Sequence, residues 1–217
     1  MNCRLLLILS QRKPPVPAKS SQEMIGVPSE VGRIFDQIEM SGSGLDVLIN
    51  NAGIAWMGLL TDMSIEEWNR MISTNLSSAF YCCRAALPYM IHQKAGRIIN
   101  ISSMWGTVGA SCEVAYSATK SGLNGLTRAL AKELAPSNIQ VNAIACGVID
   151  TVMNDLLDAE EKAAIAEEIP AGRFGTPEEV ALLAWQLANA PAYLTGRYWV
   201  WTEDISNSYS QILSHFA

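Results

Sequence analysis

Arg97-Ile98-Ile99-Asn100-Ile101-Ser102 is a short isoleucine-rich run, and it is the middle one of three such runs in this 217-residue chain. The other two are Leu45 to Ile49 and Gln140 to Ala145. Short apolar runs with β-branched residues favour strands, and continuous apolar runs are typical of strands covered on both faces. The three runs therefore predict the centre of a parallel sheet.

The segments between these runs carry helical patterns. Ser64 and Glu67 have the spacing of a capping box, which predicts a helix running toward Met90. Thr176 and Glu179 repeat this spacing, with a proline at the first helical position. Apolar residues at helical spacing predict a third helix over 115–134.

Strand and helix alternate from about Val27 onward, which is the signature of an α/β fold. We expect a doubly wound parallel sheet (Rossmann-like) in three α/β/α layers, with right-handed crossovers and the carboxyl ends of the strands along one edge. The expected domain spans 27–196. Residues 1–26 and 197–217 do not follow the pattern and form an atypical N-terminal segment and an atypical C-terminal tail.

Composition limits the classes of partner. The net charge is −6, with 49% hydrophobic and 17% charged residues, which suits one globular domain. No basic run suggests binding to nucleic acid or to a membrane, and the apolar run Leu5 to Leu9 is too short for a signal peptide or a membrane span. Five cysteines without paired spacing indicate a reducing, cytoplasmic compartment and no metal site: Cys3, Cys82, Cys83, Cys112 and Cys146.

Tyr116-Ser117-Ala118-Thr119-Lys120 places a phenol and an ammonium four residues apart, hence on one face of a helix. A neighbouring cation favours the phenolate, so we expect the pKa of Tyr116 to be lowered toward the working pH. Such a tyrosine is suited to act as a general acid toward a carbonyl. Alone, a pair of this kind is more often a surface pair.

Further motifs flank this pair in order along the chain: Asn50-Asn51-Ala52-Gly53, Asn75, Ser102-Ser103, and Cys146-Gly147-Val148-Ile149-Asp150-Thr151. With them, the chain resembles the short-chain dehydrogenase/reductase family over about 27–196. It is most similar to the bacterial 3-oxoacyl-acyl-carrier-protein reductases.

The resemblance implies a role for each matching residue. Tyr116 would donate the proton, Ser103 would hydrogen-bond the substrate carbonyl, Lys120 would bind the nicotinamide ribose, and Asn75 would hold a water linking Lys120 to solvent. The cofactor would be a nicotinamide dinucleotide, with NADP(H) favoured over NAD(H), and no metal is implied. The residues expected to contact the cofactor are Asn51, Ala52, Gly53, Tyr116, Lys120, Gly147, Ile149 and Thr151.

The same resemblance implies a carbonyl substrate, free or bound to acyl-carrier protein, and a homo-oligomer formed through the helices bearing Asn75 and Tyr116. Trp105 and the segment Gly109 to Val114 also look like the subgroup that reduces a ketone on modified elongation factor P. There, Glu113 would sit at the pocket mouth and attract a substrate amine. Alternatively, Glu113 is an ordinary exposed carboxylate beside a loop.

The chain departs from the family at both ends. Residues 1–26 contain a single glycine, Gly26, so the glycine-rich turn that would approach the pyrophosphate is missing. After Gly196 the expected last strand and its Asp-Gly-Gly turn are absent. We expect an incomplete sheet at its first and last strands and impaired activity, and a single-base frameshift near each end would explain both departures. A non-catalytic remnant associating with intact relatives stays open.

Overall fold

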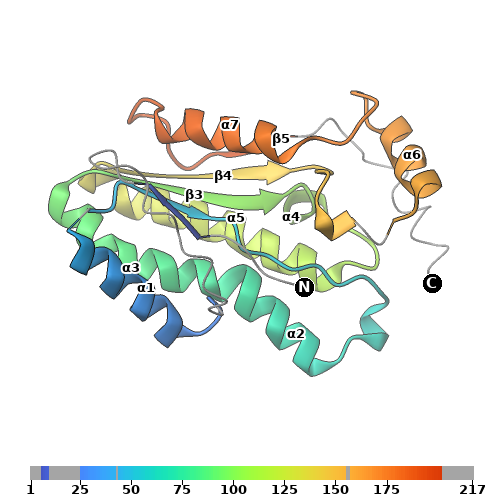
Figure 1. The fold of residues 1–217 in the computed structure, drawn as a ribbon, viewed down its shortest axis with the longest axis horizontal. Coiled ribbons are helices and arrows are strands. Elements are labelled where there is room, and N and C mark those ends of the chain that lie inside the picture. The colour runs from blue at the N-terminus through green and yellow to red at the C-terminus, as the bar shows by residue number, and fades with distance from the viewer. Residues whose placement is uncertain (1–5, 10–24, 43, 155–156, 202–217) are drawn as a thin grey trace.

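The computed structural model describes residues 6–9, 25–42, 44–154 and 157–201, and its layers are visible in Figure 1. A sheet lies between two helical layers. The strands are β1 (Leu6–Leu9), β2 (Val47–Asn50), β3 (Gly96–Ser103), β4 (Ile139–Cys146) and β5 (Tyr198–Trp201). They are hydrogen-bonded in the order β1-β2-β3-β4-β5. The predicted α/β/α fold is confirmed, and the three apolar runs form β2, β3 and β4.

The α-helices are α1 (Pro28–Ser41), α2 (Ile65–Ile72), α3 (Ser78–Gln93), α4 (Trp105–Val108), α5 (Val114–Leu134), α6 (Ala159–Glu168) and α7 (Pro177–Ala188). Short turns of other helix types are η1 (Leu60–Asp62), η2 (Ser73–Ser77), η3 (Ala135–Ser137) and η4 (Val152–Asn154). Both predicted capping boxes are present, at the starts of α2 and α7. Asp158 and Glu161 form another at the start of α6, which sequence reasoning missed.

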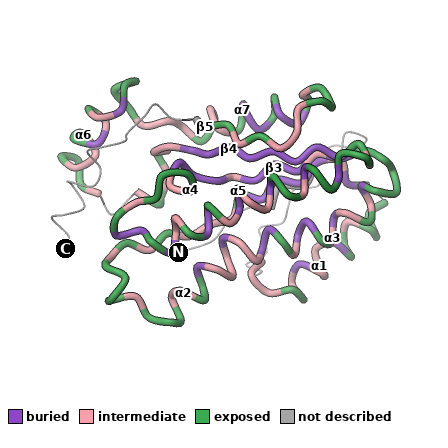
Figure 2. The backbone as a smooth tube through the Cα atoms, turned by 180° about the vertical axis from the view of Figure 1, so that it is seen from behind, coloured by how far each residue is buried: buried purple, intermediate pink, exposed green. Residues whose placement is uncertain are grey.

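Two apolar cores cover the faces of the sheet, because successive strand residues point to opposite sides. On one face Leu48, Ile98 and Val141 pack against α1, α3 and α5. On the other face Ile49 and Ile144 pack against α7. Figure 2 shows the result, with β3 and β4 buried along their length between the two layers.

The expectation of right-handed crossovers throughout is wrong. Strands β2 to β5 are parallel and follow one another in a single direction across the sheet. Helices α3 and α5, which connect the first three, lie on one face, whereas α7, which precedes β5, lies on the other (Figure 1). The last crossover therefore has the opposite hand. The long connection after β4 allows α7 to reach a face whose apolar side chains need cover.

The sheet was expected to be incomplete at its first and last strands, and the structure has a short strand in each of these outer positions. Tyr198–Trp201 forms β5, parallel to β4, inside the segment predicted as a tail. Leu6–Leu9 forms β1, which fills the position beside β2 but runs antiparallel to it. Backbone ladders require few particular side chains, so an apolar run pairs with an open strand edge. The segment 10–24, where the missing phosphate turn belongs, lies outside the described residues.

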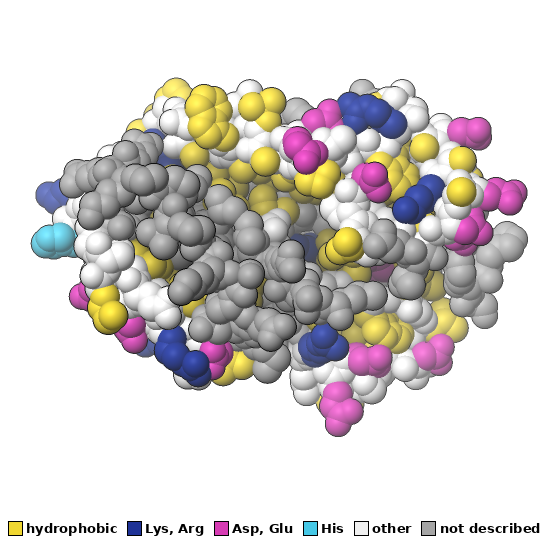
Figure 3. All heavy atoms as spheres, viewed as in Figure 1, with side chains coloured by type: hydrophobic (Ala, Val, Ile, Leu, Met, Phe, Trp, Pro, Cys, Tyr) yellow, Lys and Arg dark blue, Asp and Glu magenta, His cyan; other side chains and the backbone are white. Residues whose placement is uncertain are grey.

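Surface features agree with the composition. On the face shown in Figure 3, acidic side chains lie over the ends of α2 and α6, and lysine and arginine side chains do not gather into one patch. Apolar side chains are exposed on α7, among them Leu182 and Trp185. In the described part of the chain, no helix is both long and apolar enough to cross a bilayer.

Candidate active site

The carboxyl ends of β2, β3 and β4 meet at one edge of the sheet. In register, Asn50 lies beside Asn100, and Ser103 lies beside Cys146. The predicted site segments follow these strand ends: 51–53 after β2, Ser103 at the end of β3, and 147–151 after β4. Ligands of open α/β sheets bind at this edge, so the topology gathers the predicted residues where a ligand would be expected.

Buried side chains hold the carboxyl edge together from within the sheet. The Asn50 amide donates to Asn100 Oδ1 at 2.8 Å, and the Asn100 amide donates to Thr127 Oγ1 of α5, also at 2.8 Å. These bonds tie β2 to β3 and both strands to α5, the helix that carries Tyr116. A buried network of this kind fixes one relative position of its members.

Tyr116 lies in the first turn of α5, directly beside Ser103. The two side chains share a hydrogen bond, which favours the phenolate and lowers the pKa of Tyr116. Ser103 Oγ also accepts from the backbone N–H of Trp105 at 3.2 Å, so the serine is held by the turn that begins α4. The fold therefore brings together two of the residues that the sequence predicted for the site, one from a strand end and one from a helix.

Lys120 lies one turn along α5, and its residue is only 4% exposed. Its Nζ donates to the carbonyl oxygen of Ile101 in β3 at 2.9 Å and lies 5.4 Å from the centre of the Tyr116 ring. The phenol and the ammonium therefore share a helix face, as the sequence spacing predicts. An ion buried this deeply needs such a partner, because an isolated one is strongly disfavoured.

The expected lowering of the Tyr116 pKa is wrong for this structure. Desolvation is the largest influence and raises the pKa above its ordinary value, and the nearby carboxyl of Glu113 raises it further. The hydrogen bond from Ser103 opposes both but does not outweigh them. The sequence spacing predicted that Lys120 lies near the Tyr116 ring. The burial of Tyr116 and the position of the Glu113 carboxyl depend on the tertiary structure, and these two effects raise the pKa.

Asn75 lies in η2, a π-helical turn inserted between α2 and α3, so the predicted helix from Ser64 toward Met90 is continuous but locally widened. Its Oδ1 accepts from the backbone N–H of Ile54 at 2.8 Å, and its Nδ2 donates to the Ile54 carbonyl at 2.9 Å. Turns of this type are frequent at functional sites. Here the turn carries a side chain that fixes the loop after β2.

That loop borders the region where a nicotinamide cofactor would be held. A Cβ built on Gly53 would lie 3.5 Å from Lys120 Nζ and 3.6 Å from Asn75 Oδ1, so this glycine leaves both polar groups open toward the loop. The buried Asn50 Oδ1 has no partner among the described residues. Asn50 is one of the residues that line a small pocket, with Ile25, Asn51, Ala52, Asn75, Ser78, Ala79 and Leu123.

These features fit a nicotinamide cofactor at this edge of the sheet, because polar groups of Lys120 and Asn75 lie next to Gly53 and the unpartnered Asn50 Oδ1 belongs to a residue of the pocket that Asn75 also lines. The residues predicted to contact the cofactor lie in the loop after β2, on α5 and in the segment after β4, and their contact with it stays a prediction: Asn51, Ala52, Gly53, Tyr116, Lys120, Gly147, Ile149 and Thr151. The phosphate half has no comparable cradle within the described ranges.

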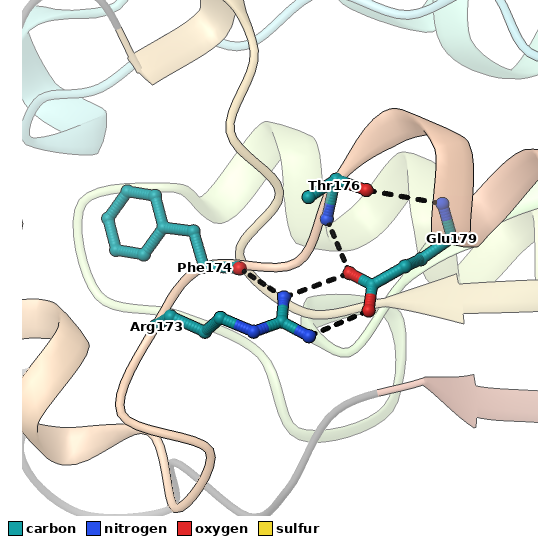
Figure 4. A network of polar contacts seen from close by, with 4 residues as sticks. All are labelled: Arg173, Phe174, Thr176 and Glu179. Atoms are coloured by element: carbon teal, nitrogen blue, oxygen red, sulfur yellow. Dashed lines mark hydrogen bonds and ion pairs between the residues drawn. The ribbon is translucent and has the colours of Figure 1, made fainter.

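The segment after β4 is fastened by a separate network. Gly175 pairs with Ile149 in a parallel bridge, with bonds from Asp150 N–H to Gly175 O (2.8 Å) and from Gly175 N–H to Val148 O (3.0 Å). Figure 4 shows how the neighbouring residues are held: Arg173 reaches both carboxylate oxygens of Glu179, which also accepts from Thr176 N–H. The start of α7 thus fixes the position of Ile149.

Two further side chains approach Tyr116 that were not predicted to do so. Cys146 is buried and influences the pKa of Tyr116, while burial raises its own pKa to about 11. Its position directly before Gly147, a residue predicted to contact the cofactor, is the sequence signal that could have indicated that Cys146 lies near Tyr116. Glu113 is buried rather than exposed at the pocket mouth, because the loop before α5 folds inward. Trp105 packs beside the cluster of Met104 and Ile165.

Within the described ranges, no three His, Cys, Asp or Glu side chains gather as metal ligands. What the fold and site define instead is a nicotinamide-dependent oxidoreductase with a Ser-Tyr-Lys arrangement at the carboxyl edge of a parallel sheet. The chain belongs to the short-chain dehydrogenase family, whose model matches residues 20–162.

Named relatives agree with this membership. The chain is 44% identical over 167 residues to the 3-oxoacyl-[acyl-carrier-protein] reductase FabG of Aquifex aeolicus, covering 76% of this chain and 67% of that protein. The FabG of Escherichia coli is 39% identical over 170 residues, covering 78% and 70%. The crystal structure of a provisionally assigned gluconate dehydrogenase from Agrobacterium tumefaciens superposes with a TM-score of 0.78 at 35% identity, covering 81% and 71%.

Proposed function

We propose that this chain reduces the ketone of a 3-oxoacyl thioester carried by acyl-carrier protein to the 3-hydroxyacyl thioester. The observation that carries the proposal is the contact of Ser103 with Tyr116 beside the buried Lys120. The names of the relatives support the substrate class, since both reductases act on acyl-carrier-protein thioesters.

In this mechanism the substrate carbonyl oxygen is held by the hydroxyls of Ser103 and Tyr116. A reduced nicotinamide cofactor, when bound, supplies the hydride. Tyr116 donates its proton to the oxygen as negative charge develops there, which is general acid catalysis. The Lys120 ammonium, 5.4 Å from the ring centre, stabilises the phenolate that remains. Asn75 keeps the loop containing Gly53 in place beside Lys120.

The preferred cofactor in this proposal is NADP(H). The relatives' activity supports a nicotinamide dinucleotide, and the choice between its two forms normally depends on residues after the first strand. Those residues fall in 10–24, so the proposal includes weakened cofactor binding. A high KM for NADPH with retained specificity for the thioester is the expected kinetic pattern.

We also propose that the chain associates with a second copy through α3 and α5 and works in the cytoplasm. Phe80 and Val114 expose apolar side chains on these helices, at 49% and 44%. The described cysteines are free thiols, which suits a reducing compartment. Sedimentation of the protein and of Phe80→Glu tests the association: a monomeric wild type contradicts it.

The proposed activity is tested by following NADPH oxidation with an acetoacetyl thioester. We expect turnover in the wild type and a loss of about 10²–10⁴-fold in Tyr116→Phe, the range of general acid catalysis. Tyr193→Phe is the matched control, because Tyr193 is 99% exposed. Equal rates for Tyr116→Phe and wild type, or no oxidation at saturating NADPH, would contradict the proposal.

A further inference from the structure

The loop that follows β2 begins beside the side chains of the candidate site. Asn75 hydrogen-bonds both backbone groups of Ile54, at 2.8 and 2.9 Å. A Cβ on Gly53, the residue before, would lie 3.5 Å from Lys120 Nζ. The first residues of this loop are therefore fixed by contacts of their own, next to the ammonium group that lies near the Tyr116 ring.

A few residues further on, the same loop reaches the segment that precedes α5. Gly58 N–H donates to Cys112 O at 2.9 Å. Helix α5 begins two residues after Cys112 and carries Tyr116 in its first turn. Residues 54–58 therefore border the site between Lys120 and the start of the helix that carries Tyr116.

Between these two attachments, Trp56 is bonded to a residue outside the loop. Its indole Nε1–H donates to Glu67 Oε1 at 2.9 Å. The other carboxylate oxygen, Oε2, accepts from the backbone N–H and from the hydroxyl of Ser64, each at 2.8 Å, in the capping box at the start of α2. Hydrogen bonds to an ionised carboxylate are stronger than neutral ones. One carboxylate thus joins the loop to the first turn of α2.

The indole ring of Trp56 also lies against the backbone of Gly58. A Cβ on Gly58 would lie 2.7 Å from the indole Cη2 atom, so a larger residue would push the ring away. The ring therefore supports the residue that donates to Cys112. Met57 lies between the two and is 44% exposed, so the loop presents an apolar side chain at its surface.

We propose that Trp56 and Glu67 are positioning residues for the thioester substrate: their hydrogen bond holds residues 54–58 against Cys112 and thereby fixes the wall of the site beside Tyr116. The inference rests on the proposed function, since that function supplies the thioester. Neither residue has to touch the reacting atoms. Placement alone is sufficient, because a displacement of about 1 Å can cost about 10²-fold in rate.

The contacts of the loop predict which kinetic constants change. Asn75 fixes the start of the loop through Ile54, independently of Trp56, so the part next to Lys120 should keep its position. Loss of the bond between Trp56 and Glu67 should therefore lower kcat/KM for the thioester and leave the KM for NADPH almost unchanged. A role in stability alone would lower the midpoint of urea unfolding and change neither constant.

The experiment is a double-mutant cycle on this hydrogen bond. Trp56→Phe keeps an aromatic ring over Gly58 but has no N–H to donate. Glu67→Gln keeps the capping box, because Glu and Gln both serve at this position, but it offers one acceptor oxygen in place of two. The two single variants and the double variant are assayed with acetoacetyl-N-acetylcysteamine and NADPH. Urea unfolding of each variant measures its stability.

The controls carry the same substitutions on other elements. Trp185→Phe removes an indole N–H from a side chain that is 61% exposed on α7. Glu161→Gln changes the corresponding residue of the capping box at the start of α6. Both controls should keep the kcat/KM of the wild type.

We expect each single variant to lose about tenfold in kcat/KM for the thioester, the size of a hydrogen bond to a charged group. Both variants remove the same bond, so the double variant should lie close to either single variant. Losses that multiply in the double variant, or losses no larger than those of the controls, would overturn the inference. A lower urea midpoint with unchanged kcat/KM would assign the bond to stability alone and would also overturn it.

A binding measurement separates this inference from the proposed function. The indole N–H resonance of Trp56, identified by its absence in Trp56→Phe, is followed while the reduced product 3-hydroxybutyryl-N-acetylcysteamine is added. If no ketone is reduced, but this product shifts the resonance and binds about tenfold more weakly to Glu67→Gln, the proposed function fails and the inference stands. If the ketone is reduced and neither kcat/KM nor binding depends on Glu67, the function stands and the inference fails. No reduction, with binding that is absent or independent of Glu67, overturns both.

Discussion

The side chain of Asn75 and the backbone of Ile54 hydrogen-bond to each other in both directions, at 2.8 and 2.9 Å. One side chain amide thus satisfies both polar groups of a single residue in the loop after β2. The resemblance to the family suggested instead a water-holding role for Asn75. A water-holding role stays a prediction, and the contacts in the structure add a structural role that can be tested separately.

Replacing Asn75 by alanine should leave the N–H and C=O of Ile54 without these partners. We expect a loss of about 2 kcal/mol or more in the free energy of unfolding, from the cost of unpaired backbone groups, and a large drop in activity. Urea unfolding and hydrogen exchange at the Ile54 amide measure both effects. Asn69→Ala, at an exposed position of α2, should change stability by less than about 0.5 kcal/mol. Equal protection of the Ile54 amide in Asn75→Ala and wild type would show that the hydrogen bonds between Asn75 and Ile54 do not stabilise the loop after β2.

Gly106 and Gly125 offer a matched comparison. A Cβ on Gly106 would lie 2.7 Å from the carbonyl carbon of Lys120, whereas a Cβ on Gly125 meets nothing within 4 Å. Gly106→Ala should push α4 away from α5 and destabilise by about 1–3 kcal/mol, as overpacking does. Gly125→Ala should stabilise α5 by about 0.5–1 kcal/mol. Thermal unfolding of the two variants should shift in opposite directions, and a common direction would contradict the close approach of α4 to α5.

Burial of Glu113 predicts a pH dependence of stability. Its folded pKa is raised from 4.5 to about 7, so the folded state binds more protons between these values. The free energy of unfolding therefore falls as pH rises from 4.5 to 7, by about 3 kcal/mol at most for a shift of this size. Glu113→Gln should remove this fall and be more stable than the wild type at pH 8, but not at pH 4. Urea unfolding of both proteins at pH 4 and pH 8 tests this prediction. If the free energy of unfolding depends on pH in the same way for both, the carboxyl is not desolvated.

Arg173 lowers the pKa of Glu179 to about 2, together with the hydrogen bonds from Thr176. A depressed carboxyl pKa contributes stability above the unfolded value of 4.5, and that contribution is lost as pH falls toward 2. Arg173→Ala should therefore lower the melting temperature at pH 7 and have little effect near pH 2. Because the same network holds Gly175 beside Ile149, we also expect a higher KM for NADPH with a smaller change in kcat.

The control for this prediction is Arg33→Ala. Arg33 forms an ion pair with Glu30 within α1, three residues apart and partly exposed to solvent, and such pairs contribute little to stability. If both variants lower the melting temperature equally, the Arg173 network has no special role. If only the melting temperature changes in Arg173→Ala and the KM does not, the link to Ile149 fails.

Particular elements show why the sequence predicted the centre of the fold better than its edges. The runs that became β2, β3 and β4 are buried on both faces, so their hydrophobicity is visible without any knowledge of neighbours. Strands β1 and β5 lie at the edges of the sheet, where backbone hydrogen bonds to one neighbour are sufficient to form a strand. Nothing in Tyr198–Trp201 required a strand there, and only the open edge of β4 supplied its partner.

The candidate site divides in a similar way. The proximity of Tyr116 to Lys120 follows from helix geometry, and that of Ser103 to both follows from strand order, so local pattern and topology were sufficient. The burial of Glu113 depends on Cys112 and Gly58, residues from two different loops. No sequence pattern links those loops, so the sequence placed the carboxyl at the pocket mouth or in solvent, and the pKa of Tyr116 was predicted in the wrong direction.

By itself, the sequence determined the α/β class, the helix starts and the set of polar residues at the carboxyl edge, because periodicity and capping act over a few neighbouring residues. Only the tertiary structure decided the charge environment of that set, because desolvation depends on which distant segments cover a group. Tyr116, Lys120 and Glu113 lie within eight positions of one another in the chain. Whether each carries a charge depends on residues far away from them.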